Sequence, residues 1–183
     1  MLAISVLNLF ALTSFSIPAS SDTKNAENNS ASVLVIIEGV EKSPGEEVSL
    51  HLCEKLVIND FAITVAIIPY LNKKELTGSD SLVKKLRELY NRYPEKVSFA
   101  LEGLEHIKNE LDKPLSEQIN ILSRAQSIFS QAFNKNFGGY RLLANALLPS
   151  YGQYNSDTII AARQAGIKVI IGSKFNNSQG YTL

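Results

Sequence analysis

The sequence predicts an α/β protein built on a parallel β-sheet. Five short apolar runs are unbroken rather than alternating, which is typical of strands buried on both faces. Helical patterns, each with one apolar stripe, separate most of these runs. The predicted strands are Val33–Ile37, Ala62–Ile68, Val97–Leu101, Ala146–Leu148 and Lys168–Ile171. An alternating β-α series of this kind forms either a closed barrel or an open, doubly wound sheet.

The helices between these strands are predicted by apolar residues at helical spacing. They are Glu46–Asn59, Ser79–Tyr93, Leu115–Phe133 and a shorter helix that begins at Ser156 and ends at Gly166. A glycine-rich phosphate-binding loop after the first strand would favour the open sheet. The first strand is instead followed by Glu38, Gly39, Val40 and Glu41, so that loop is missing and the barrel is favoured.

Length and composition fit one soluble globular domain. The chain has 183 residues, of which 45% are hydrophobic and 20% charged, with a formal net charge of zero. No block of Lys and Arg stands out, which argues against nucleic acid or an anionic membrane surface as a partner. Cys53 is the only cysteine, so no intrachain disulfide can form. Its place on an apolar helical stripe indicates a buried structural thiol.

The N-terminus predicts export. Residues 1–20 form an apolar stretch that ends in small residues and is too short for a comfortable transmembrane span, as in a secretory signal peptide. No positive charge precedes the apolar core, so an uncleaved membrane anchor is the alternative. Residues 21–31, rich in Ser, Asn and charge, predict a flexible linker to a domain that covers residues 32–183. We therefore expect a secreted or extracytoplasmic protein.

Three segments carry a resemblance to a known family. Residues 147–158 read LLPSYGQYNSDT, residues 33–40 read VLVIIEGV, and residues 99–106 read FALEGLEH. In this order they resemble three motifs of the polysaccharide deacetylases, the NodB-like carbohydrate esterases. The motifs are the RPPYG-x-x-N loop, a first strand that ends in Asp-Asp, and a third strand that ends in H-G-x-x-H. The order and spacing of the three segments favour a divergent member of that family.

The resemblance implies a fold and an activity. The family fold is a distorted (β/α) barrel of about seven strands, of which about five are predicted here, so we expect an incomplete barrel. The family activity is the metal-dependent hydrolysis, usually with zinc, of N- or O-acetyl groups on a carbohydrate polymer or oligomer. The family pattern places Glu38 as the catalytic base and Glu102 and His106 as metal ligands. It places Pro149, Tyr151 and Asn155 in the substrate-binding loop.

Departures from the family pattern weaken the catalytic prediction. Glu38 and Gly39 stand where the family has Asp-Asp, Glu102 replaces the first metal-binding His, and Leu148 replaces the Arg of the loop. A catalytic zinc needs three protein ligands, an open position for water and a separate base. Glu38, Glu102 and His106 can at most fill the ligand positions, so we expect a divalent metal to be held weakly or not at all.

Three function classes remain open. They are a deacetylase with altered ligands, a degenerate relative that binds a glycan or a protein, and an enzyme of the same fold with another reaction. Structural roles are also open: Glu102, Glu105 and His106 are predicted to begin a helix that runs to Leu111, where acidic residues stabilise the helix dipole. If the site is functional, Glu38, His106 and residues 151–155 should converge on one cleft at the carboxyl ends of the strands.

Overall fold

The chain folds around one central sheet. The computed structural model describes residues 34–41, 46–134, 142–172 and 174–175. The predicted signal segment 1–20 and linker 21–31 lie outside these residues. Within the described part, no helix is both long and apolar enough to cross a membrane.

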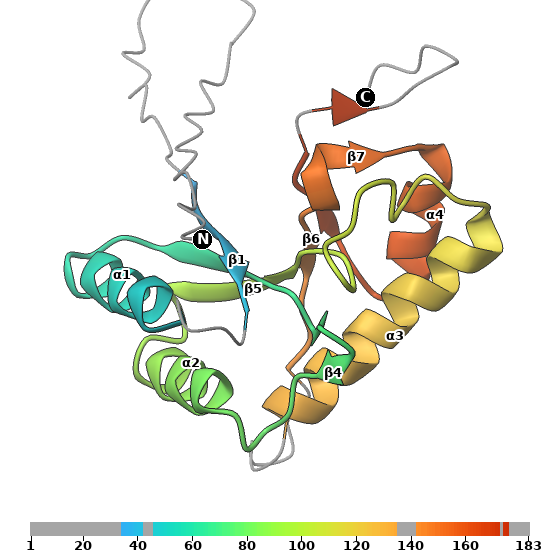
Figure 1. The fold of residues 1–183 in the computed structure, drawn as a ribbon. Helices are drawn as coiled ribbons and strands as arrows, with labels where there is room; N and C mark the ends of the chain where they lie inside the picture. Colours follow the sequence, from blue (N-terminus) through green and yellow to red (C-terminus); the bar gives the residue numbers. More distant parts are fainter. Residues whose placement is uncertain (1–33, 42–45, 135–141, 173, 176–183) are drawn as a thin grey trace, which may run out of the picture.

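Five parallel strands form the central sheet, in the order β1-β2-β5-β6-β8 (Figure 1). They are β1 (Val35–Val40), β2 (Ile63–Ile67), β5 (Val97–Leu101), β6 (Ala146–Leu147) and β8 (Val169–Ile170). Every adjacent pair is parallel, which confirms the predicted sheet. Among the described strands, β1 and β8 are the two edges and do not pair with each other, so this part of the chain forms an open sheet rather than a closed barrel.

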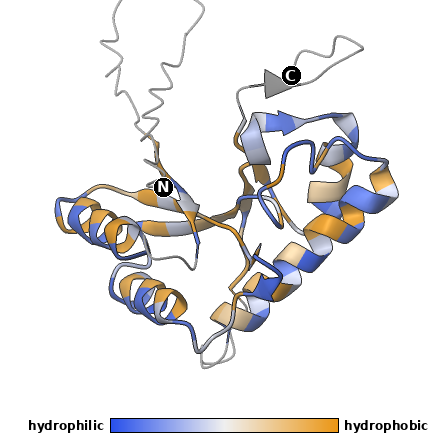
Figure 2. Cartoon of the chain, in the orientation of Figure 1, coloured by the Kyte–Doolittle hydropathy of each residue, from blue (hydrophilic) through white to orange (hydrophobic). Residues whose placement is uncertain are grey.

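The four predicted helices are all present. They are α1 (Glu46–Ile58), α2 (Ser81–Arg92), α3 (Leu115–Phe133) and α4 (Ser156–Gln164). The large apolar residues of α2 and α3 mostly turn toward the interior (Figure 2), whereas Val48 and Ile58 of α1 and Ile159 and Ile160 of α4 are exposed. Cys53 of α1 is fully buried, as the sequence predicts.

All four helices contribute to a single core on one face of the sheet. Every second residue of the strands points to this face, and Val35, Val65 and Leu147 are among those that share the core with buried residues of each helix. Strand residues that point to the other face form a separate small cluster of Ile36, Ala66, Ala100 and Ala146. A helical layer on one face only is the arrangement of a (β/α) barrel wall, whereas a doubly wound sheet has helices on both faces.

Aromatic side chains fix α3 against the middle of the sheet. The ring centroid of Phe99 in β5 lies 5.6 Å from that of Phe129 and 5.0 Å from that of Phe133, and the two α3 rings stack at 4.4 Å. Both α3 rings are fully buried. Removing one such ring costs about 3–5 kcal/mol of stability, so this contact anchors the strand whose carboxyl end carries the candidate site.

Several short elements were not predicted. They are the hairpin β3 (Tyr70–Leu71) and β4 (Lys74–Glu75), the 3₁₀ turn η1 (Ser150–Gly152), and the parallel pair β7 (Gln153–Tyr154) and β9 (Lys174–Phe175). The hairpin turns through Asn72 and Lys73, both with positive φ. Short elements of this kind carry too few residues for a periodic signal.

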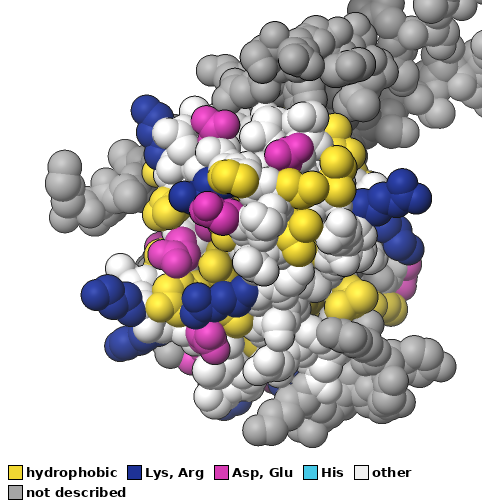
Figure 3. All heavy atoms as spheres, turned by 90° about the vertical axis from the view of Figure 1, so that its right-hand side faces the viewer, with side chains coloured by type: hydrophobic (Ala, Val, Ile, Leu, Met, Phe, Trp, Pro, Cys, Tyr) yellow, Lys and Arg dark blue, Asp and Glu magenta, His cyan; other side chains and the backbone are white. Residues whose placement is uncertain are grey.

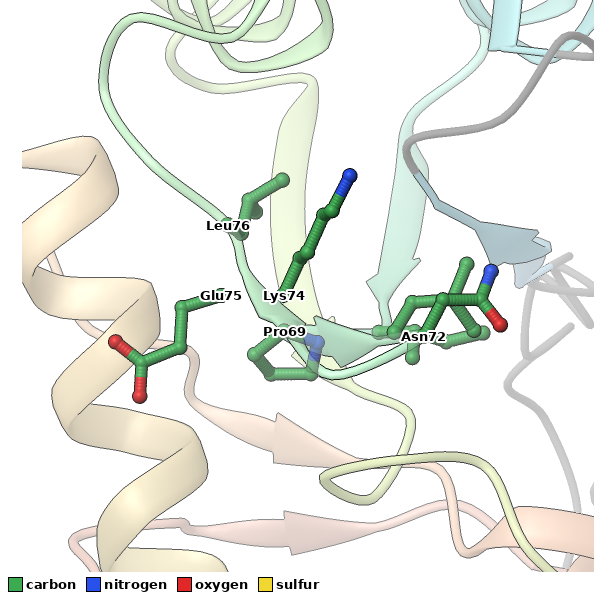
Figure 4. Close-up of a pocket in the computed structure, with 7 residues that line it drawn as sticks. Pro69, Asn72, Lys74, Glu75 and Leu76 are labelled. Atoms are coloured by element: carbon green, nitrogen blue, oxygen red, sulfur yellow. The ribbon is translucent and has the colours of Figure 1, made fainter.

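A shallow hollow of about 170 Å³ lies along the β3–β4 hairpin (Figure 4). It is lined by Ile68, Pro69, Leu71, Asn72, Lys74, Glu75 and Leu76. The carboxylate of Glu75 points toward α3, where Arg124 lies 3.3 Å from it and over the ring of Tyr70. On the face shown in Figure 3, acidic and basic side chains are interspersed with apolar ones, so this face presents no large field of one sign.

The helix predicted from Glu102 to Leu111 is wrong. Residues 102–111 form a loop with turns, and His106 and Asn109 have φ values of 55° and 59°. A positive φ is incompatible with a right-handed helix. The amide groups that a helix would leave free in its first turn are instead bound by the side chain of Glu110, as described below.

Candidate functional site at the carboxyl ends of the strands

Glu102 lies at the centre of the candidate site. It follows β5 directly, its amide donates to the carbonyl of Ile67 at 2.8 Å, and its side chain is only 4% exposed. One carboxyl oxygen, Oε2, accepts a hydrogen bond from the amide of Gly39 at 2.6 Å. The other, Oε1, lies 3.2 Å from Nε2 of His106. One carboxyl group therefore connects the end of β1, the end of β5 and the loop that follows.

Burial controls the ionisation of this carboxyl group. Removal from water raises the pKa of Glu102 from 4.5 to about 7; the Gly39 hydrogen bond opposes the rise, and the nearby charges of Glu38, Glu41 and Glu110 add to it. Near neutral pH both protonation states are populated. The protonated form can donate to a neutral imidazole of His106, and the ionised form can accept from its N–H.

The end of β1 brings Gly39 and Glu38 to this group. The pairing of β1 with β2 is irregular between Ile37 and Val40, and Gly39 has a φ of 65°. This irregularity turns the Gly39 amide toward Glu102. Glu38 lies inside β1, not after it as predicted, because the strand continues to Val40. Its side chain is half-buried, and its charge is near enough to raise the pKa of Glu102.

A second buried carboxylate, Glu110, organises the loop. It is 3% exposed. Its Oε1 accepts hydrogen bonds from the amides of Leu104 at 2.9 Å and Glu105 at 2.8 Å, and its Oε2 accepts from Oγ of Ser150 at 2.8 Å. Sequence reasoning missed Glu110 and Ser150. Gly103 was the available signal, because a glycine directly after a strand predicts a sharp turn with close approach of other groups.

His106 and Tyr151 form an exposed pair of stacked rings, here called the aromatic platform. Their ring centroids are 5.0 Å apart and their planes are tilted by only 15°. Tyr151 is 60% exposed and the His106 side chain 33%. Both residues have left-handed backbone conformations, with φ values of 55° and 57°. Such conformations are costly outside glycine and cluster at functional sites.

The other predicted loop residues have structural contacts. Pro149 is buried, and its carbonyl accepts from the Gly152 amide at 2.8 Å. Asn155 caps α4: its Oδ1 accepts from the amide of Thr158 at 3.2 Å and from Nε2 of Gln118 at 3.0 Å. A capping side chain of this kind stabilises the helix start. Of the three predicted substrate-binding residues, Tyr151 is the one most open to solvent.

The zinc that the family resemblance implies does not fit these residues. In the described part of the chain, no three His, Cys, Asp or Glu side chains are grouped so as to hold a metal ion. Both oxygens of Glu102 are engaged, one by the Gly39 amide and one by His106. A catalytic zinc needs three protein ligands, and among the described residues Glu102 and His106 have no third ligand grouped with them.

The structure brings together part of the predicted site. His106 contacts Glu102 on one side and stacks on Tyr151 on the other, and the Gly39 amide joins β1 to Glu102. Asn155 is held against α3 through Gln118. The direct meeting of the Glu38 carboxylate with His106 stays a prediction.

These features define an α/β protein with helices on one face of a parallel sheet and a polar site at the carboxyl ends of the strands. Comparison with models of known protein families gives no match, and neither does comparison with curated proteins. Among solved structures, the chain is similar to a wild-type CE4 family pseudoenzyme from Bacillus anthracis, with a TM-score of 0.50 and 14% identity. A mutant of that protein with restored enzymatic activity gives a TM-score of 0.47 and 13% identity.

The similarity covers 75% of this chain and 41% of the wild-type pseudoenzyme, and for the mutant 75% and 42%. The chain thus spans about two fifths of the length of the solved structures that it matches. At this identity the wild-type structure shows a shared fold and no more. That fold is part of the CE4 fold, the fold of the polysaccharide deacetylases, as the three sequence segments predict.

Proposed function

We propose that this chain is a catalytically degenerate, polysaccharide deacetylase-like protein that binds a glycan on the aromatic platform. The observation that supports a loss of catalysis is the set of contacts made by the Glu102 carboxyl group. Its carboxyl group occupies the position of a metal-binding His in the family pattern and is bound to the Gly39 amide and to His106. A ligand position is thereby converted into an internal contact between strand and loop.

The number of candidate residues also argues against zinc-dependent hydrolysis. Zinc-dependent deacetylation needs a polarised water and a separate base. Glu38 is the remaining candidate for the base, and among the described residues Glu102 and His106 then have no third ligand grouped with them to hold the metal. The likeness in fold to a protein described as a pseudoenzyme supports the same proposal.

The glycan-binding part of the proposal rests on the aromatic platform. Ligand sites of (β/α) folds are built from loops at the carboxyl ends of the strands, and both rings come from such loops. Binding sites are lined by aromatic side chains with a few polar groups beside them. A flat ring pair whose Tyr151 is open to solvent, beside the half-buried side chain of the adjacent residue Glu105, offers an apolar surface to the C–H face of a sugar and acceptors to its hydroxyl groups.

The finer parts of the family resemblance belong to the same proposal. We propose that the one-sided sheet is part of a distorted barrel of the deacetylase type, and that the protein meets its carbohydrate partner outside the cytoplasm. An active, metal-dependent deacetylase with Glu38 as base and with Glu102 and His106 as ligands is the alternative. His106 stands at a metal-ligand position of the family pattern, which favours that alternative, whereas the lack of a third ligand grouped with Glu102 and His106 among the described residues opposes it.

Three measurements on the purified full chain test the proposal. Metal analysis should find less than one zinc per chain, and acetate release from chitin-like or peptidoglycan-like oligomers should stay at background. The same oligomers should nevertheless bind, as followed by calorimetry. Stoichiometric zinc together with acetate release would establish the alternative.

A matched pair of variants assigns the binding surface. Tyr151→Leu should weaken glycan binding by about tenfold, as expected from the loss of about 1.4 kcal/mol of stacking. Phe61→Leu is the control, because Phe61 is also an exposed aromatic residue, at 48%, but precedes the amino end of β2, whereas the platform follows the carboxyl ends of the strands. Equal binding by the wild type and Tyr151→Leu would place the glycan elsewhere.

A further inference from the structure

We propose that the buried carboxylate of Glu110 is the positioning residue of the aromatic platform, because it joins the two loops that carry His106 and Tyr151. This inference rests on the proposed function, since it explains how the glycan-binding surface is held in shape. Glu110 was not part of the predicted site, and it has no place in the family pattern described above.

The Glu110 side chain is buried among hydrogen-bond donors and has no paired cation among the described residues. Only 3% of the residue is exposed. Burying a carboxylate without a cation is costly unless hydrogen bonds replace the lost water. Here three donors do so, two amides and one hydroxyl. These three hydrogen bonds, at 2.8–2.9 Å, take the place of water around the buried carboxyl group.

The donors to Glu110 come from the two segments that carry the rings of the platform. The amides belong to Leu104 and Glu105, and Glu105 directly precedes His106. The hydroxyl belongs to Ser150, which directly precedes Tyr151. One carboxylate thus fixes the backbone immediately before each ring of the platform, although the two rings are 45 residues apart by their numbers (151 minus 106).

The backbone at both rings of the platform is strained. His106 and Tyr151 both adopt a left-handed conformation, which L-amino acids other than glycine avoid. Strain of this kind persists only where surrounding contacts over-determine the conformation. The hydrogen bonds of Glu110 act on the residue before each strained position, so their loss should let both loops relax and the rings separate.

Gly103 supports the same interpretation. A Cβ atom at this position would lie 2.0 Å from Oε2 of Glu110 and 2.5 Å from Oγ of Ser150. The glycine therefore leaves the room in which the carboxylate and the hydroxyl meet. Its φ of 67° also turns the chain so that the following amides point at Glu110.

Proton NMR of the histidine rings provides a direct test. The chain has two histidines, the exposed His51 and His106, so His51→Gln assigns both sets of signals. Stacking of Tyr151 on His106 should shift the His106 ring protons upfield, and Tyr151→Leu gives their position without the stack. The shift therefore reports the platform itself, independently of any ligand.

Three variants separate positioning from stability. Ser150→Ala removes the 2.8 Å hydrogen bond of the Ser150 hydroxyl to Glu110 and its longer contact, at 3.5 Å, with the carbonyl of Glu102, so the His106 signals should move most of the way to their Tyr151→Leu position. Glycan affinity should fall by about threefold, the effect of one hydrogen bond. Glu110→Gln should retain the stack, because its oxygen can accept from the two amides and its NH₂ can donate to Ser150. Thr64→Val is the control, since Thr64 is also buried and the change removes its hydroxyl hydrogen bond with Ser98 in the sheet.

The outcomes distinguish this inference from the proposed function. Unchanged His106 signals and unchanged glycan affinity in Ser150→Ala would overturn the positioning role while leaving glycan binding in place. Loss of the stack in Ser150→Ala, with a melting temperature no lower than that of Thr64→Val, would support it. If the stack is lost in this way but the wild type binds no glycan, the positioning role stands and the proposed function fails.

Discussion

The buried carboxyl group of Glu102 should make the stability of the protein depend on pH, and Glu102→Gln should remove that dependence. Burial is the main reason that the pKa rises from 4.5 to about 7 in the folded state. The folded chain therefore binds this proton more tightly than the unfolded chain. Stability from the protonated group is fully present below about pH 4.5 and is lost as the pH rises through about 7.

The size of the effect follows from the two pKa values. A difference between 4.5 and about 7 corresponds to about 3 kcal/mol in the free energy of unfolding, an order-of-magnitude figure. The glutamine variant is neutral at every pH and has nearly the same shape as the protonated acid. Its oxygen can accept from the Gly39 amide, and its NH₂ can donate to a neutral His106. It should therefore be more stable than the wild type by about 3 kcal/mol at about pH 8, and nearly equal to it at about pH 4.5.

Urea unfolding followed by circular dichroism at several pH values measures this difference. Glu88→Gln on the exposed side of α2 is the control, because it removes the same charge from a solvated position and should change stability by less than about 0.5 kcal/mol. A difference between wild type and Glu102→Gln that does not change with pH would refute the reasoning. So would a variant that is less stable at the higher pH, since the ionised carboxylate would then be the form that the fold prefers.

Gly103→Ala should lower the free energy of unfolding by more than about 2 kcal/mol, because its Cβ would overlap a buried carboxylate oxygen. Gly39→Ala, whose Cβ would meet nothing within 4 Å, should cost only about 1 kcal/mol for its positive φ; equal costs in urea unfolding would contradict this. Cys53 should resist a thiol-specific disulfide reagent until the protein unfolds, because burial raises its pKa to about 12, and rapid labelling of the native protein would disprove that. The triple change Glu38→Asp, Gly39→Asp and Glu102→His should raise zinc affinity by about tenfold or more in calorimetry, since it restores the family ligands; an unchanged affinity would show that the remaining geometry cannot form the site.

The main elements of the fold could be predicted from local sequence patterns. The strand Val97–Leu101 and the helix Leu115–Phe133 have the predicted bounds, because an unbroken apolar run and a long helical stripe each identify their element without reference to the rest of the chain. The start of α4 at Ser156 was also predicted, because Ser156 and Asp157 are residue types that begin helices. In each case the deciding interactions join residues that are close in sequence.

The loop after β5 shows where such patterns fail. Glu102, Glu105 and His106 carry the spacing of a first helical turn, yet the chain there forms no helix. The amides of Leu104 and Glu105 bind the side chain of Glu110, and that side chain is held in turn by Ser150. Ser150 lies 40 positions after Glu110 in the chain, and no local sequence pattern around Glu102 predicts that contact.

The sequence by itself determined the order of strands and helices, most of the apolar residues that form the core, and the departures from the deacetylase pattern at Gly39 and Glu102. Only the tertiary structure decided what Glu102 does instead. Its carboxyl group lies between His106 and an amide 63 residues away in the chain, and burial there changes its pKa. The physical reason is that hydrophobic periodicity is a local property, whereas burial, charge and hydrogen bonding at this site depend on which distant segments the folded sheet places side by side.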